Sequence, residues 1–150
     1  MTIRRAEAED WQGLRDLRLR ALADSPDAFL ATLEEAKARS DEEWGNWGQD
    51  GAIFVAEPFD GMAGGFVTDE GDVMLWGMWV TPERRGSGLA EALARAVIDW
   101  ARGEGAPRVV LWVVIGNAPA ERFYERLGFV ATGVTAKLRN GLDRELALDL

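Results

Sequence analysis

Two glycines, Gly86 and Gly88, lie where an apolar stretch gives way to an amphipathic one, with Arg84 and Arg85 immediately before them. Glycine lets the backbone turn tightly, so that successive amides at the start of a helix can point at one anion, and the helix dipole adds to the attraction. A pyrophosphate group would fit such a loop. A tight turn without any ligand explains the two glycines equally well, so the surrounding residues must decide.

Two common nucleotide-binding loops do not match this segment. The third glycine of the dinucleotide-binding pattern would fall at Glu91, and the chain has no Gly-Lys-Ser or Gly-Lys-Thr sequence of a P-loop. Both nucleotide interpretations are therefore weakened.

The composition restricts the chemistry further, because the 150 residues include neither Cys nor His. Disulfides, thiolate metal sites and an acyl-cysteine intermediate are excluded, and the usual general base and the commonest transition-metal ligand are missing. Any chemistry must use carboxylates, hydroxyls, Arg, Lys and backbone amides, and we expect no metal.

The charge and the apolar runs indicate the cellular setting. A formal net charge of −9 argues against nonspecific nucleic-acid binding and slightly favours cationic partners, although solubility alone explains it too. No apolar run is long enough to span a membrane, and the first residues are charged, unlike those of a signal peptide. We therefore expect a cytoplasmic protein with no nucleic-acid or membrane partner.

The apolar periodicity predicts one domain in which strands and helices alternate. A short strand at 2–5 should precede a helix with Trp11, Leu14, Leu17, Ala21 and Leu22 on one face. A second helical stretch should run through Phe29, Leu33 and Ala36, followed by a loop at 44–48. The further predictions are a hairpin (53–56 and 62–67), a long strand (73–80), a helix from Leu89 to about Gly103, a strand parallel to it in the same sheet (109–115), a helix after Asn117 and two last strands (129–137 and 144–150).

The segment from Trp79 to Ala90 resembles the acetyl-CoA loop of the GNAT superfamily of N-acetyltransferases. That superfamily has an Arg/Gln-x-x-Gly-x-Gly/Ala signature, which Arg85, Gly88 and Ala90 match, and a typical Val-x-Pro before it, present here at Val80 and Pro82. A second block of the family follows at the usual distance. It comprises the strand 109–115 and then Asn117, Ala120, Phe123, Tyr124, Glu125, Leu127, Gly128 and Phe129.

The resemblance covers nearly the whole chain and implies its fold and activity. The fold would be α/β (α+β), a single GNAT-like domain at 1–150 with a mixed central sheet of about six to seven strands flanked by about four helices. The protein would be a transferase, an acyltransferase that moves an acetyl group from acetyl-CoA to an amine. Its partner would be a small-molecule, peptide or protein amine, and homodimers are frequent in the superfamily.

The resemblance also implies which residues hold the donor. The backbone of Met78, Trp79 and Val80 would pair with the pantetheine arm, at an edge opened between the two central parallel strands. The pyrophosphate would lie on the amides of Arg85, Gly86, Ser87, Gly88, Leu89 and Ala90, with Arg84 adding charge. Asn117 would contact the pantetheine, and it can also cap the following helix.

Acyl transfer to an amine needs a proton donor for the departing thiolate and a free-base amine. Tyr124, the only Tyr of the chain, occupies the family position of the proton donor, although simple aromatic packing would also explain it. An amine of pKa about 10.4 is almost wholly protonated at neutral pH, so a base is needed. Some members of the superfamily carry a Glu where this chain has Trp112. Glu57 is therefore our candidate base, with Glu34 and Glu35 as alternatives.

In the superfamily, the first two helices and the last hairpin line the acceptor pocket. The resemblance places Phe29, Trp44 and Trp76 there, although each of these side chains could simply belong to the core. The acceptor itself stays open among small amines, amino acids, antibiotics and protein N-termini. Two other functions also stay open, a noncatalytic acetyl-CoA-binding regulatory module and a phosphate-binding domain that does not use CoA.

Overall fold

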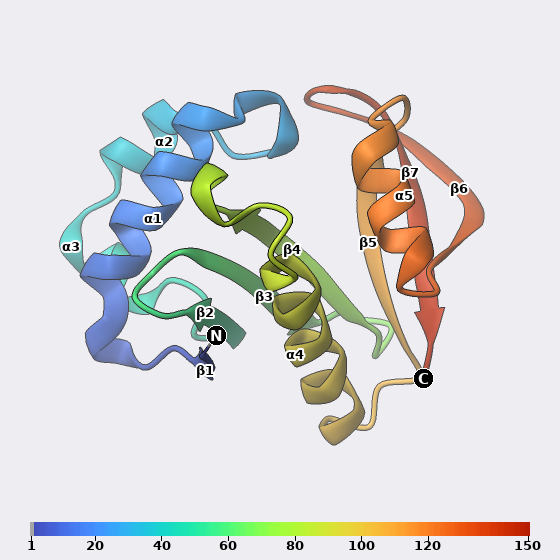
Figure 1. The fold of residues 1–150 in the computed structure, drawn as a ribbon, viewed down its shortest axis with the longest axis horizontal. Coiled ribbons are helices and arrows are strands. Elements are labelled where there is room, and N and C mark those ends of the chain that lie inside the picture. Colours follow the sequence, from blue (N-terminus) through green and yellow to red (C-terminus); the bar gives the residue numbers. More distant parts are fainter. Residues whose placement is uncertain (1) are drawn as a thin grey trace.

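Seven strands form one mixed sheet in the computed structural model, which describes residues 2–150 (Figure 1). The strands are β1 (Ile3–Arg5), β2 (Gly51–Ala56), β3 (Gly61–Val67), β4 (Val73–Val80), β5 (Arg108–Val114), β6 (Val130–Leu138) and β7 (Gly141–Asp149). The helices are α1 (Trp11–Asp24), α2 (Leu33–Ala38), α3 (Asp41–Asn46), α4 (Leu89–Gly103) and α5 (Ala118–Arg126). The spatial order of the strands is β1-β2-β3-β4-β5-β7-β6.

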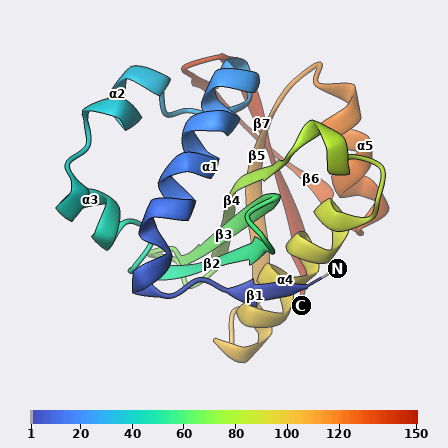
Figure 2. The same cartoon turned by 60° about the vertical axis from the view of Figure 1, so that its left-hand side comes forward.

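The two faces of the sheet are covered by different helices, α1 to α3 on one face and α4 and α5 on the other (Figure 2). Along β2, Ile53 and Val55 pack toward α1, whereas Ala56 packs toward α4. Strands covered on both faces are apolar on both faces, as the sequence predicts for the centre of the sheet. The core is therefore two layers of side chains with the sheet between them.

A bulge in β4 interrupts the regular alternation of its side chains. Gly77 has a φ of 68°, and the register with β3 shifts by one residue at this point. Trp76 and Trp79, three residues apart, consequently face the same side, toward α1, which a regular strand would not allow. The extra residue lies in the part of β4 that faces the site described below.

The two central strands, β4 and β5, are parallel but pair only at their beginnings. Val73 is opposite Val109 and Met74 is opposite Val110, and beyond these residues the strands diverge (Figure 1). β5 pairs along its whole length with β7 on its other side. The second halves of β4 and β5 thus present backbone edges to each other across a gap.

The predicted fold class and the sequence of strands are confirmed, but two local predictions are wrong. Trp44 lies in helix α3 rather than in a loop, because Ser40 caps that helix and Glu43 completes a capping box. Phe29 is extended (φ −126°, ψ 149°) rather than helical, and α2 begins only after Thr32 caps it. Gly45 and Gly48 favour a loop at 44–48, and the apolar Phe29 favours an early start of the second helix. The capping residues Thr32 and Ser40 instead determine where α2 and α3 begin.

A close contact in the sheet gives a first test of the packing. A methyl group on Gly64 of β3 would lie 2.5 Å from the Trp76 ring, whereas one on Gly45 of α3 would meet no atom within 4 Å. We expect Gly64→Ala to lower the free energy of unfolding by about 1–3 kcal/mol through overpacking. Gly45→Ala, the matched control, should leave it unchanged or raise it slightly. Denaturant unfolding of both variants checks this, and equal effects would contradict the packing of Trp76 on Gly64.

Candidate active site

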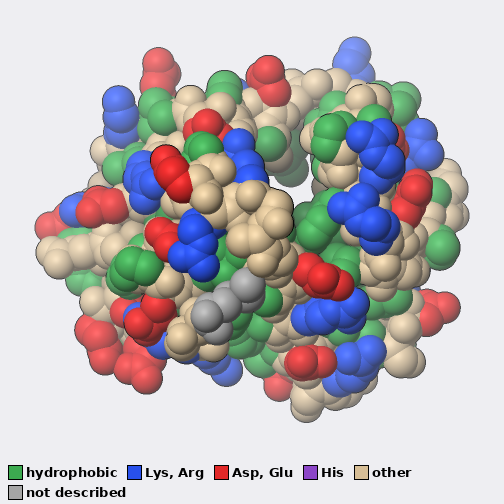
Figure 3. All heavy atoms as spheres, in the orientation of Figure 1, with side chains coloured by type: hydrophobic (Ala, Val, Ile, Leu, Met, Phe, Trp, Pro, Cys, Tyr) green, Lys and Arg blue, Asp and Glu red, His purple; other side chains and the backbone are tan. Residues whose placement is uncertain are grey.

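A cavity of about 550 Å³ lies where β4 and β5 separate, and the space-filling view shows the molecule hollowed between its two halves (Figure 3). β4, β5, β7, α5 and the segment between α1 and α2 all contribute to its wall. The residues that line it include Arg18, Phe29, Arg39, Trp76, Gly77, Met78, Trp112, Asn117, Tyr124 and Asp143. The fold therefore joins residues from opposite ends of the chain at one hollow.

The glycine loop lies between β4 and α4. Gly86 and Gly88 have φ values of 80° and 86°, a conformation that favours glycine, and Gly88 is the residue before the first turn of α4. Neither position has an atom within 4 Å of where a methyl group would be. The first amides of α4 have no carbonyl partner within the helix, so this loop offers donors and open space for an anion.

The two arginines of the loop are engaged with carboxylates instead of pointing freely outward. Arg84 donates to Asp60 at 2.7 Å. Arg85 donates to the Val80 carbonyl at 3.1 Å and to Asp24 at 2.8 Å, which binds the loop to the end of α1. The Arg85 hydrogen bond is the main reason why the pKa of Asp24 falls to about 2. In this structure the arginine side chains hold the loop in place.

Tyr124 lies in α5 and lines the cavity while most of its ring is buried. Its ring packs edge-on against Phe123 and Phe129, at centroid distances of 5.0 and 5.7 Å. Burial raises the pKa of the phenol, so Tyr124 keeps its proton at neutral pH. Tyr124 therefore packs against its aromatic neighbours and lines the cavity at the same time.

Asp143 in β7 is a carboxylate of the cavity wall that was not among the site residues predicted from the sequence. It is only 4% exposed, and its Oδ1 atom has no hydrogen-bond partner among the described residues. Burial raises the pKa of this carboxyl, because the charged form has lost its hydration. The sequence carried one signal for it. The alternation of side chains along this strand places Asp143 on the face opposite to Leu146 and Leu148, away from their core cluster.

Asn117 and Met78, two of the residues predicted to contact acetyl-CoA, both line the cavity. The Asn117 side chain accepts a hydrogen bond from the Ala120 amide at 3.4 Å, which makes it the cap of α5, and the residue lines the cavity at the same time. Met78 lines the cavity just beyond the β4 bulge. Trp79 and Val80 are buried and continue β4 toward the glycine loop.

Of the predicted acceptor residues, Phe29 and Trp76 line the cavity and Trp44 does not. Trp44 is buried beneath it, edge-on to Trp47 at 5.1 Å. The Phe29 carbonyl accepts hydrogen bonds from Arg139 at 3.0 Å and from Asn140 at 2.8 Å. The turn between β6 and β7 is thereby joined to the segment between α1 and α2, over the cavity.

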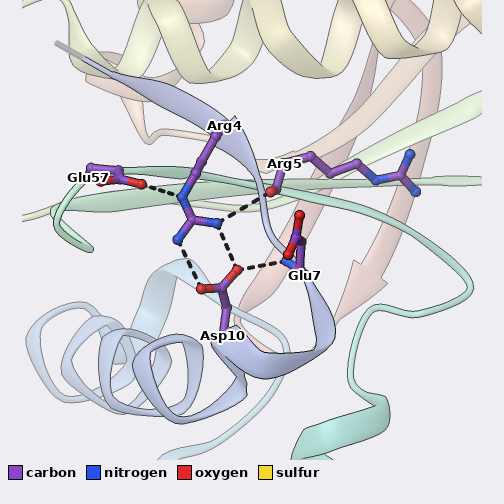
Figure 4. Close-up of polar contacts among 5 residues, drawn as sticks. All are labelled: Arg4, Arg5, Glu7, Asp10 and Glu57. Atoms are coloured by element: carbon purple, nitrogen blue, oxygen red, sulfur yellow. Dashed lines mark hydrogen bonds and ion pairs between the residues drawn. The ribbon is translucent and has the colours of Figure 1, made fainter.

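The three glutamates considered as bases lie away from the cavity. Glu57 follows β2, is half exposed, and accepts a hydrogen bond from Arg4, which also binds Asp10 (Figure 4). Glu34 and Glu35 are exposed on α2, where Thr32 donates to Glu35 at 2.9 Å. The geometry therefore gives Glu57 a structural ion pair with Arg4, and it leaves Asp143 as the carboxylate at the cavity wall.

No helix within residues 2–150 is long and apolar enough to cross a membrane. The same residues contain no group of three or more Asp and Glu side chains placed to hold a metal ion.

Solved structures with the same fold include yncA from Salmonella typhimurium, determined with its cofactor acetyl-CoA. It superposes with a TM-score of 0.75 at 24% identity, over 100% of this chain and 94% of that chain. The ribosomal-protein-alanine N-acetyltransferase of Brucella melitensis gives a TM-score of 0.77 at 19% identity, over 100% of both chains. At these identities the likeness establishes the fold alone.

Curated relatives include two mycothiol acetyltransferases. That of Thermobispora bispora is 34% identical over 134 residues, 82% of this chain and 44% of the relative, and that of Thermomonospora curvata is 36% identical over 121 residues, 77% and 39%. The chain thus spans less than half the length of these relatives. The model of the acetyltransferase (GNAT) family matches residues 11–129, well over half of the chain. The protein therefore belongs to the GNAT acetyltransferase family.

Proposed function

We propose that this chain transfers an acetyl group from acetyl-CoA to an amine by direct attack. The observation that carries the proposal is the gap between β4 and β5, which has Tyr124 in its wall and the glycine loop at the end of β4. The membership of the acetyltransferase family and the acetyl-CoA bound to yncA support the same donor.

The described residues offer partners for three parts of acetyl-CoA, namely the pantetheine arm, the pyrophosphate and the thioester. The unpaired edges of β4 and β5 offer backbone donors and acceptors for the amides of the pantetheine arm, as an added strand would use them. The amides around Gly86 and Gly88 and the start of α4 would bind the pyrophosphate. Acetyl-CoA supplies the thioester, whose carbonyl would lie near Met78.

The residues of the cavity divide the chemistry between them. The amine nitrogen attacks the thioester carbonyl, the new C–N bond forms and the C–S bond breaks. The Tyr124 hydroxyl gives its proton to the departing thiolate, for which a phenol that stays protonated is suited. A backbone amide near Met78 would polarise the carbonyl during the attack, as in an oxyanion hole.

In this proposal Asp143 is the general base, in place of Glu57, which was the candidate from the sequence. The attacking amine must lose protons, and a carboxylate with a raised pKa is a stronger base than an exposed one. Asp143 accepts the proton of the ammonium directly or through one water molecule. The alternative proposal, a regulatory module that binds acetyl-CoA without catalysis, requires neither Asp143 nor Tyr124 to matter.

The first test concerns the loop. Gly88→Ala should weaken acetyl-CoA binding by at least about tenfold, because a side chain at a left-handed φ strains the backbone that must face the pyrophosphate. Gly105→Ala is the matched control, since Gly105 also has a positive φ (76°) and open space but lies after α4. Calorimetric titration with acetyl-CoA measures both. Equal loss in the two variants would assign the effect to stability and would count against the loop.

The second test concerns turnover. Wild-type protein, acetyl-CoA and a panel of polyamines, amino acids, aminoglycosides and peptides should release free thiol with one class of amine. Tyr124→Phe keeps the ring contacts with Phe123 and Phe129 and should lower kcat about 100-fold with little change in acetyl-CoA affinity. Tight donor binding without turnover of any amine would favour the noncatalytic module, and absence of donor binding would contradict the whole proposal.

The third test uses the pKa of Asp143. Because this pKa is raised in the folded chain, the folded state holds the proton more tightly than the unfolded state, and stability falls as the pH rises through the folded-state pKa. Asp143→Asn cannot ionise, so its Tm should exceed that of the wild type at pH 7, and the difference should shrink below about pH 4. Its kcat/KM should fall about 100-fold and lose the acid limb of the pH profile.

The control for this variant is Asp149→Asn, at an exposed position at the end of the same strand. It should change neither the Tm at pH 7 nor the pH profile. A lower Tm for Asp143→Asn at pH 7 would show that Asp143 holds the fold together, and an unchanged pH profile would remove it from the reaction.

A further inference from the structure

Arg18 of α1 is a buried cation in the cavity wall for which the described residues supply no anion. It is only 6% exposed, and its Nε and Nη1 atoms have no hydrogen-bond partner. Buried charges in proteins are normally paired. Burial lowers the pKa of the guanidinium to about 10, but Arg18 stays charged at neutral pH.

Aromatic rings surround this guanidinium and fix its position. Its Cζ atom lies 4.7 Å from the Phe29 ring centroid, 5.5 Å from that of Trp47 and 5.8 Å from that of Trp76. Ring faces attract a cation but do not accept its hydrogen bonds in the plane of the guanidinium. Since Arg18 lines the cavity while Nε and Nη1 are closed off from solvent, we expect Nη2 to be the nitrogen that faces the cavity.

A second arginine reinforces the positive charge of this wall. Arg39 also lines the cavity, its Nη1 atom is buried without a partner, and its charge contributes to the lowered pKa of Arg18. It lies over Trp44 at 4.8 Å and over Trp47 at 5.8 Å. The two cations repel each other, and an anion in the cavity beside them would relieve that repulsion.

The negative group of the cavity wall lies on another element. Asp143 is in β7, and its Oδ1 atom has no partner among the described residues, Arg18 and Arg39 included. One cavity wall thus carries cationic groups and a carboxylate, each with atoms that have no partner within the described chain. A molecule that satisfies both carries an ammonium and an anion.

We propose that the acceptor is an amine that also carries a carboxylate, as an amino acid does, and that Arg18 binds this carboxylate while the amine lies at Asp143. This rests on the proposed function, which it makes more specific. A guanidinium nitrogen donates a strong, charge-assisted hydrogen bond to a carboxylate, and Nη2 would make this contact because Nε and Nη1 are closed off from solvent. The aromatic walls would enclose the side chain of the acceptor. An acceptor carboxylate would give Arg18 the anionic partner that the described residues do not supply.

The experiment compares each of the common L-amino acids with its carboxamide, at a fixed saturating concentration of acetyl-CoA, by thiol release. At least one amino acid should be acetylated with a kcat/KM at least about 100-fold above that of its own carboxamide. Arg18→Gln should raise the KM for this amino acid about 100-fold and leave the carboxamide unaffected. Arg18→Lys should restore part of the loss, because it keeps the charge without the planar fork.

Arg20→Gln is the control variant, since Arg20 is an exposed residue of the same helix and does not line the cavity. It should behave as wild type. Arg18→Met gives a readout independent of activity. Removal of an unpaired buried charge should raise the Tm of the free protein, whereas a merely structural Arg18 would make the Tm fall.

The outcomes separate this proposal from the proposed function. Turnover of neutral amines or carboxamides equal to that of the amino acids, or acetyl-CoA affinity lost in Arg18→Gln, overturns the carboxylate site and leaves the acetyltransferase intact. If no amine is turned over, thermal shift of the CoA-bound wild type by amino acids still decides, because a shift that Arg18→Gln abolishes supports the site and no shift overturns it. Failure of the wild type to bind acetyl-CoA contradicts the proposed function itself.

Discussion

The separation of two parallel strands is the constraint on which the rest of this molecule depends. β4 and β5 pair at two positions, Val73 with Val109 and Met74 with Val110, and Arg108 donates to Asp72 at 3.0 Å beside that junction. Beyond it, backbone groups that a continuous sheet would have paired are left at two facing edges. Unpaired edges are costly in a core unless something else pairs with them. The fold thus contains a place for an extended ligand, and the site residues are those that surround it.

The arginines near the glycine loop and the charged residues of the cavity wall differ in whether they have ion-pair partners. Near the glycine loop the arginines are paired, Arg84 with Asp60 and Arg85 with Asp24. In the cavity wall, Arg18 and Asp143 are buried, and each has atoms without a partner. Unsatisfied buried charges lower stability, so a protein keeps them where another molecule completes them. Two buried charges without partners in one wall therefore mark that cavity as the functional part.

Periodicity and turn residues were sufficient for the strands and long helices, because these elements are apolar at regular spacing and end at Gly or Pro. The site was only partly predictable. Arg18 lies between Leu14 and Ala21 on the buried face of α1. Apolar periodicity alone does not indicate that a charged residue is buried on that face. Asp143 could not be assigned to the same cavity as Tyr124 without the register of β7 on β5, where it lies opposite Val114. Glu57 was selected for its strand end, which does not reveal that Arg4 would bind it.

The gap between the two halves of the sheet is bounded at both ends, and this determines what it can admit. At one end, β4 and β5 are joined by their two pairs. At the other, Arg139 and Asn140 bind the Phe29 carbonyl, which joins the last hairpin to the segment after α1. Both halves of the molecule therefore contact each other on either side of a cavity of about 550 Å³. In the proposed reaction, the end of a pantetheine arm would share that volume with the acceptor. The volume would then favour small amines, and we propose that the charges of the wall select among them.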